Sequence, residues 1–204
     1  MRLPTAPKSL ASHAVRAERA ARIRDPHVEP INSLIDEIAR STGYPALPYI
    51  DPTFGGTRAR ALMVLKAPEA DADPDKAGTR LLSIDNDDTG AANLFDAFAR
   101  HGIDRTGIKP WNICPFPIAG DKPTAAERRE AAPYTRKVLA MMPNVQFIVT
   151  LGAAARDGWK PRLLHPTRQL TIMAGASPSP PGINRAEQRS SFEAAMRQLA
   201  DCLR

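Results

Sequence analysis

Short runs of apolar residues, each bounded by residues that favour turns, recur along the chain. They predict buried strands at residues 59–66, 108–115, 145–151 and 169–173. Apolar residues spaced three and four apart predict amphipathic helices instead, at residues 31–43, 89–101, 124–140 and 186–203. Because strands alternate with helices, the pattern predicts an α/β fold. We expect a three-layer α/β/α sandwich with a four-stranded, mainly parallel sheet.

Proline, glycine and polar residues separate these elements. They predict loops at residues 44–57, 67–80 and 174–184. Thr124, with Glu127 three residues later, has the sequence of a capping box and predicts the start of one helix.

The first 28 residues differ in composition from the rest. Residues 8–24 are helix-prone and rich in arginine, and Asp25-Pro26 ends this stretch. We therefore divide the chain into a basic helical N-terminal arm, residues 1–28, and a domain formed by residues 29–204. The arginines could contact phosphates, but we favour a solvated helical arm.

Acidic residues gather immediately before one predicted helix. Asp85, Asp87 and Asp88 lie within four positions, with Asn86 among them, and Asp88 or Thr89 is the expected N-cap. One interpretation is a capped, solvated loop. The other is a loop that presents a carboxylate to a substrate, and local sequence does not decide between them.

Composition limits the function classes. The 204 residues carry a formal net charge of +6, which favours an anionic partner such as nucleic acid. No apolar run approaches the length of a membrane span, and the basic N-terminus lacks the apolar core of a secretory signal. Two cysteines are too few for a disulfide framework or a four-thiolate cluster. We therefore expect a cytoplasmic, metal-free globular protein, and we expect it to be a monomer.

Four segments follow predicted strands and should meet at one edge of the sheet, where ligands of parallel α/β sheets bind. They are residues 67–69, 112–116, 152 onward and 177–180. The loop at 81–88 can cover the same edge.

These segments carry a joint pattern that resembles the uracil-DNA glycosylase superfamily. It consists of DNDD at 85–88, WNICPF at 111–116, LG followed by alanines from 151, and PSP at 178–180. The resemblance covers roughly residues 28 to 200 and is closest to a bacterial branch with SxDNDD and WNxxPW segments.

The resemblance implies a DNA-repair hydrolase for base excision. Such an enzyme flips deoxyuridine out of DNA and cleaves its N-glycosidic bond without a cofactor. Some branches hold an iron–sulfur cluster with four cysteines, which this chain cannot do.

The resemblance also implies a base pocket, formed here by Ala67, Pro68, Leu81, Leu82, Asn112 and Phe116. The amide of Asn112 can donate and accept hydrogen bonds and so suits the Watson–Crick edge of a base. The alternative is an asparagine that merely closes a strand. Leu81 and Leu82 replace the usual stacking phenylalanine with apolar packing. Phe116 either supplies an aromatic face or belongs to the core.

The chemistry needs a carboxylate near the sugar and a donor for the departing base. Lys66 stands where some relatives have an acid, so Glu69 or Asp85 would have to serve, and we prefer Asp85. Ser177 stands where the superfamily usually has a histidine before Pro-Ser-Pro. His165-Pro166 imitates that motif but precedes the last strand, so we expect it at the opposite edge of the sheet.

Contacts to the DNA backbone are expected from Lys66, Pro178, Ser179, Asn184 and Arg185. The alternative for the proline-rich segment is a turn that positions the final helix. The sequence thus predicts a DNA base-excision glycosylase for a deaminated base, most readily uracil. Two alternatives stay open: a catalytically diverged DNA- or nucleotide-binding module, and an enzyme that acts on free nucleosides or nucleotides.

Overall fold

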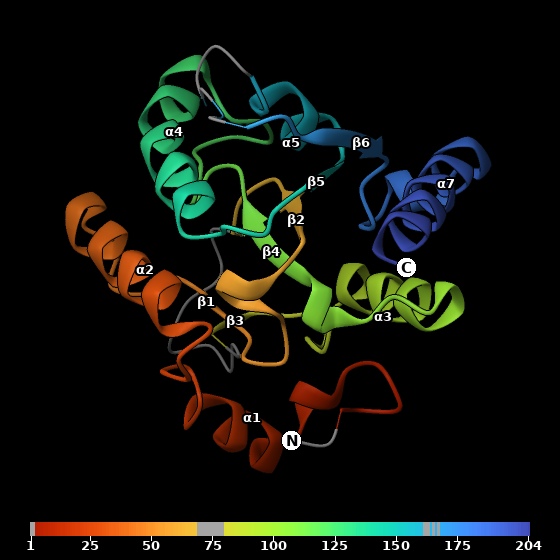
Figure 1. Cartoon of the computed structure of the whole chain (residues 1–204), viewed down its shortest axis with the longest axis horizontal. Helices are drawn as coiled ribbons and strands as arrows, with labels where there is room; N and C mark the ends of the chain where they lie inside the picture. Colours follow the sequence, from red (N-terminus) through yellow and green to blue (C-terminus); the bar gives the residue numbers. More distant parts are fainter. Residues whose placement is uncertain (1–2, 69–79, 161–163, 165, 167) are drawn as a thin grey trace.

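A parallel four-stranded sheet forms the centre of the computed structural model, which describes residues 3–68, 80–160, 164, 166 and 168–204. The strands are β2 (Ala61–Leu65), β4 (Ile108–Asn112), β5 (Phe147–Leu151) and β6 (Thr171–Gly175). Their order is β4-β2-β5-β6, and every pairing among them is parallel (Figure 1). The four strands predicted from the sequence and their parallel arrangement are therefore confirmed.

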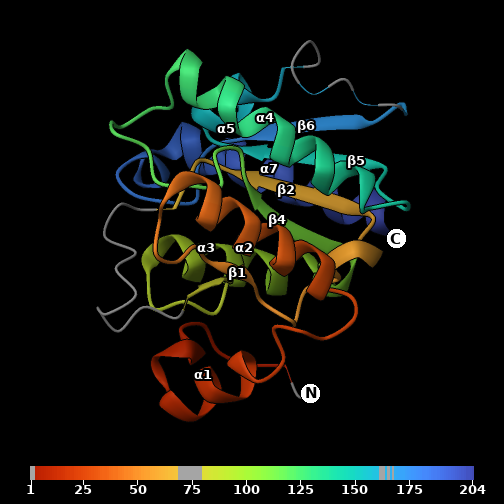
Figure 2. The same ribbon diagram turned by 90° about the vertical axis from the view of Figure 1, so that its left-hand side faces the viewer.

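Helices cover both faces of this sheet. The longer helices in the described part of the chain are α1 (His13–Ala20), α2 (Glu29–Thr42), α3 (Thr89–His101), α4 (Ala125–Ala140) and α7 (Ala186–Leu203). The short helix α5 (Ala153–Gly158) directly follows β5. Helices α2 and α4 lie on one side of the sheet and α3 and α7 on the other (Figures 1 and 2). This is the three-layer α/β/α arrangement that the alternation of elements predicts.

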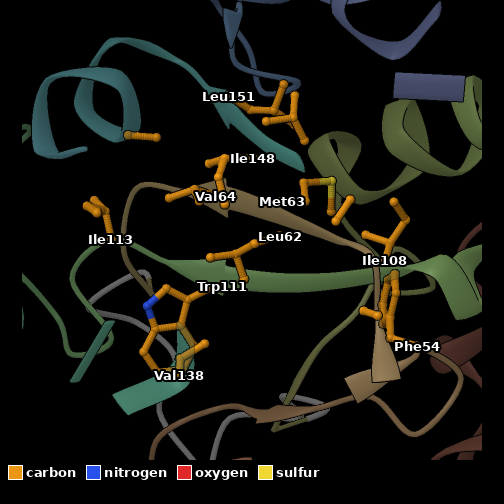
Figure 3. Packing of buried hydrophobic residues seen from close by; sticks show 14 of the residues in the cluster. Phe54, Leu62, Met63, Val64, Ile108, Trp111, Ile113, Val138, Ile148 and Leu151 are labelled. Carbon is orange, nitrogen blue, oxygen red and sulfur yellow. The ribbon is translucent and has the colours of Figure 1, made fainter. Parts of the chain in front are cut away.

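The hydrophobic core lies between these layers (Figure 3). The strand residues Leu62, Val64 and Ile148 are fully buried, as expected for a parallel sheet covered on both faces. Trp111 of β4 packs toward α4, where its indole N–H donates to Thr135 Oγ1 at 3.0 Å. The buried indole nitrogen therefore has a partner, and the end of β4 is fixed against α4.

A second, two-stranded sheet lies beside β4 and was not predicted. Strand β1 (Tyr49–Ile50) pairs in parallel with β3 (Leu81–Leu82). Residues 49 and 50 fall in the stretch predicted as a loop because two residues flanked by prolines give no periodic signal. The side chain of Asn32 in α2 holds β1 by accepting from the Ile50 backbone N–H at 2.8 Å.

The N-terminal segment is docked against the domain instead of standing in solvent. Leu10 is fully buried, and its backbone N–H donates to the Asp85 carbonyl at 3.0 Å. Arg19 of α1 is 1% exposed. The interpretation of residues 1–28 as a solvated arm is therefore wrong for these positions, although the boundary at residue 28 stays a prediction.

Lys109 of β4 is an unusual member of the core. Its side chain is fully buried, and its amine lies 4.3 Å from the centre of the Trp111 ring. It donates to the Pro110 carbonyl at 3.4 Å, and no carboxylate among the described residues pairs with it. Burial holds the pKa of this amine well below its ordinary value of 10.5 because a charge there would lose its hydration.

Lys109→Met is therefore expected to raise the free energy of unfolding at neutral pH by about 1–3 kcal/mol. Below pH 10.5 the Lys109 amine is protonated in the unfolded chain, whereas burial disfavours its protonation in the folded chain. The wild-type protein should accordingly lose stability as the pH falls below that value. Urea unfolding at several pH values should show a shallower pH dependence for the variant.

Lys137→Met serves as the control, because it removes an exposed lysine that is paired with Glu37. Its free energy of unfolding should change little. A destabilised Lys109→Met protein would contradict this account.

Candidate functional site

The carboxyl ends of the four parallel strands meet at one edge, as the sequence predicts. Leu65 at the end of β2 lies beside Asn112 at the end of β4, and Leu151 of β5 lies beside Gly175 of β6. Beyond the strands, the Cys114 N–H donates to the Lys66 carbonyl at 3.1 Å, so the first residues of these loops stay together. This edge carries most of the predicted site residues.

Asn112 occupies a distinctive environment at this edge. Its side chain is 5% exposed, yet the part of the chain that the structure describes offers it no hydrogen bond. The amide borders a small apolar hollow, which is lined by Ile35, Pro48, Ile50, Leu82, Trp111, Asn112 and Pro115. The amide oxygen and nitrogen are not among the buried polar atoms that lack a partner, so the small exposed area of this residue includes its amide, which water can reach. Such a group is suited to receive a ligand.

The hollow is much smaller than a ligand site. Its volume is about 10 Å³, roughly enough for one water molecule. Pockets that hold organic ligands are typically about 300–1,000 Å³. A base could reach Asn112 only if part of this wall moved.

The other predicted base-pocket residues divide into two groups. Leu82 lines the hollow beside Asn112, as expected. Leu81 is buried, and Phe116, 4% exposed, belongs to the hydrophobic core, which was its alternative interpretation. Ala67 is half-buried and Pro68 is buried at the end of β2. The structure therefore brings Leu82 and Asn112 together, while Leu81 and Phe116 do not line the hollow.

The Pro-Ser-Pro segment forms a second cluster at the same edge. The Ser179 N–H donates to Ser177 Oγ at 3.2 Å, and the Asn93 side chain of α3 donates to the Pro178 carbonyl at 2.7 Å. Gly152 lies against Ser177, since a Cβ at that glycine would stand 3.2 Å from the serine Cβ. Its φ of +91° also disfavours any other residue there. The sequence pattern LG before α5 thus permits the close approach of the Ser177 loop.

Asp88 is part of this second cluster. As predicted, it is the N-cap of α3, and its Oδ1 accepts from the Ala91 N–H at 2.8 Å. A Cβ at Gly90 would lie 2.5 Å from Ser179 Oγ and 3.3 Å from Asp88 Oδ1. The exposed carboxylate of Asp88 therefore lies close to the hydroxyl of Ser179.

The two clusters lie at opposite sides of the sheet. Asn112 is the last residue of edge strand β4, and Ser177 follows edge strand β6. Three strand spacings separate these edges, or about 14 Å. The Ser177 loop leans back over β5 through its contact with Gly152, which reduces the separation. A ligand that touched both clusters would span the carboxyl ends of β2 and β5.

Asp85 belongs neither to the residues around Asn112 nor to the cluster around Ser177. Its carboxylate is 0% exposed and binds Arg105 through both oxygens, at 2.8 and 3.1 Å. Arg19 of α1 reaches the same carboxylate at 3.5 Å. The expectation that Asp85 activates water or stabilises a cation at the site is therefore wrong for this structure, because neither solvent nor a ligand reaches it.

The network around Asp85 extends to a second buried acid. Asp51 accepts from Arg19 at 3.1 Å and from the backbone and hydroxyl of Thr53 at 2.8 Å each, and Ser83 also donates to it. Two arginines thus balance two carboxylates inside the protein. Paired in this way the charges can be tolerated in the interior, whereas any one of them alone could not.

The predicted phosphate-binding residues lie at the surface. Lys66, Ser179, Asn184 and Arg185 are exposed, whereas Pro178 is buried. Lys66 donates to the Asp121 carbonyl at 3.4 Å. His165 and Glu69 lie outside the described residues, so the interpretation of His165 as a mimic of the usual motif stays a prediction.

Within the described ranges, no three histidine, cysteine or acidic side chains are grouped so that they could hold a metal ion. Cys114 is fully buried, and burial raises the pKa of its thiol to about 12. None of the described helices is long and apolar enough to cross a bilayer. The expected absence of a cofactor and the monomeric state stay predictions.

Comparison with protein-family models finds no match to the sequence. Comparison with curated proteins finds none either.

Proposed function

We propose that this protein recognises a deaminated base that is flipped out of DNA, most readily uracil, and hydrolyses the N-glycosidic bond of that base. The observation that carries the proposal is the amide of Asn112, which borders the hollow at the carboxyl end of β4 and has no protein partner in the described structure. The parallel α/β fold and the resemblance in residues 85–88, 111–116 and 178–180 support the same function.

Uracil suits an amide in this setting. Its edge presents a ring N–H between two carbonyl oxygens, and an amide can accept from the N–H while it donates to a carbonyl. The apolar residues around Asn112 strengthen such bonds by excluding water. The same amide would therefore select the base and hold it.

The remaining chemistry is assigned to the second cluster. A water oxygen adds to the anomeric carbon as the bond to the base nitrogen breaks and its electron pair leaves with the base. One water proton is released, and the base takes up a proton. Asp88 replaces Asp85 as the carboxylate that stabilises the positive charge on the sugar. The hydroxyl of Ser177 donates to the departing base once its loop, which already contacts Gly152 beyond β5, closes the remaining distance to Asn112.

The DNA backbone would lie along the exposed residues of this edge. Lys66 and Arg185 supply positive charge, and Ser179 and Asn184 supply hydrogen-bond donors. The net charge of +6 favours an anionic partner. Binding through several phosphates would weaken steeply as salt rises.

A catalytically diverged binding module is the second candidate. The observation in its favour is the enclosure of Asp85, together with the uncharged hydroxyl of Ser177 where the superfamily has a histidine. A neutral donor stabilises a departing anion less than a charged one. Such a module would keep the Asn112 pocket but cleave no bond.

A panel of DNA oligonucleotides carrying uracil, hypoxanthine or xanthine tests the proposal. Alkali converts any abasic site into a strand break, and gel electrophoresis then measures excision. We expect breaks at uracil and salt-dependent binding of the duplex. Binding without breaks would favour the diverged module. If neither binding nor breaks occur, and free nucleosides are hydrolysed, the DNA proposal is wrong.

A further inference from the structure

Two proline-rich loops border the hollow at Asn112. Residues 43–48 follow α2, and residues 113–118 follow β4; Pro48 of the first and Pro115 of the second both line the hollow. A side-chain hydrogen bond joins the loops, because the Tyr44 hydroxyl donates to the Pro117 carbonyl at 3.2 Å. The loops and this bond are the natural place to look for a route to Asn112.

The rest of the wall is poorly suited to movement. Ile50 and Leu82 belong to the paired strands β1 and β3, and Ile35 lies inside α2. Trp111 is held by its bond to Thr135. A base needs far more room than the hollow's 10 Å³, so the space must come from the two loops.

The second loop is anchored at its two ends. On one side the Cys114 N–H donates to the Lys66 carbonyl at 3.1 Å, and on the other the Ala119 N–H donates to Glu127 at 3.1 Å. Across residues 115–118, the bond from Tyr44 is the hydrogen bond that the described structure provides. Breaking it would free the span between the anchors.

We propose that Tyr44 gates the Asn112 pocket, and that its bond to Pro117 must open before a base can pass between the two loops. The identity of the ligand rests on the function proposed above, whereas the gate itself does not. Tyr44 is 37% exposed, so an incoming strand can displace its hydroxyl from Pro117 and water can replace the bond. Tyr44 thus controls access to the pocket and does not act on the reacting atoms.

Cys114 provides a native reporter of this opening. It lies two residues beyond Asn112 at the base of the second loop and is fully buried. Burial raises the pKa of its thiol to about 12, so it is unreactive while the loop is closed. Opening of residues 113–118 would expose it to a thiol reagent.

The test measures the rate at which a disulfide reagent labels Cys114 in a Cys202→Ser background. Tyr44→Phe removes the hydroxyl but keeps the ring, and a hydrogen bond worth about 0.5–1.5 kcal/mol predicts labelling about 2- to 10-fold faster. Tyr134→Phe is the matched control, since that hydroxyl bonds to Ser41 at 2.9 Å between α2 and α4, and neither residue lines the hollow. Its labelling rate should equal that of the background protein.

Labelling that is unchanged in Tyr44→Phe, or that rises equally in Tyr134→Phe, would overturn the gate. The assay contains no DNA, so its result is separate from that of the oligonucleotide panel. Faster labelling in Tyr44→Phe without excision in the panel would keep the gate and reject the glycosylase. Excision in the panel together with unchanged labelling in Tyr44→Phe would keep the glycosylase and reject the gate.

Discussion

Asp85→Asn is expected to lower the free energy of unfolding by about 3–5 kcal/mol. The substitution removes the negative charge that Arg105 binds through both nitrogens and that Arg19 also reaches. All three side chains are buried, so the arginines would keep their charge without solvent to compensate for it. The loss should also loosen the N-terminal segment, because Arg19 belongs to α1.

Urea unfolding followed by circular dichroism measures this effect. Asp87→Asn is the matched control, since Asp87 lies two positions away in the same loop but is exposed and pairs with Lys8 at the surface. The control should change stability by no more than about 0.5 kcal/mol. An Asp85→Asn protein as stable as the wild type, but without activity, would return Asp85 to the functional site.

Asn112→Leu is expected to abolish base excision without loss of stability. The amide makes no hydrogen bond in the described structure, so an apolar side chain of similar size should fit the hollow at least as well. Excision should fall by at least about 100-fold, the usual effect of removing one well-placed donor from an active site. Asn112→Asp should lose activity similarly, because a carboxylate repels the carbonyl of the base.

Single-turnover excision of uracil and thermal unfolding, measured on the same preparations, separate the two roles of this residue. A structural asparagine that closes a strand would give a destabilised Asn112→Leu protein with near-normal activity. That outcome would remove Asn112 from the base pocket.

Much of the fold follows from local signals. The capping box of Thr124 and Glu127 and the cap at Asp88 are made by residues three positions apart, so the sequence displays both partners together. The parallel strands show as apolar runs because both faces are covered. Strand β1 escaped prediction because it has two residues and depends on Asn32, 18 positions away, for its bond.

The candidate site was less predictable, because residues of the same type that are adjacent in the sequence have different environments in the structure. Asp85, Asp87 and Asp88 look alike in sequence, yet one is buried between arginines, one is exposed, and one caps a helix. The arginine partners of Asp85 lie 20 and 66 positions away, and no local pattern reveals them. Tyr44 gave no signal either, since its partner Pro117 lies 73 residues further along the chain.

Nuclear magnetic resonance of the Asn112 side-chain amide tests the central claim most directly. The pair of signals from this NH₂ group can be assigned by its loss in Asn112→Asp. Titration with a duplex that carries 2′-fluoro-2′-deoxyuridine, which resists hydrolysis, should shift the pair, while a duplex with thymine at that position should leave it in place. If the pair stays unshifted when the modified duplex saturates the protein, Asn112 does not read the base.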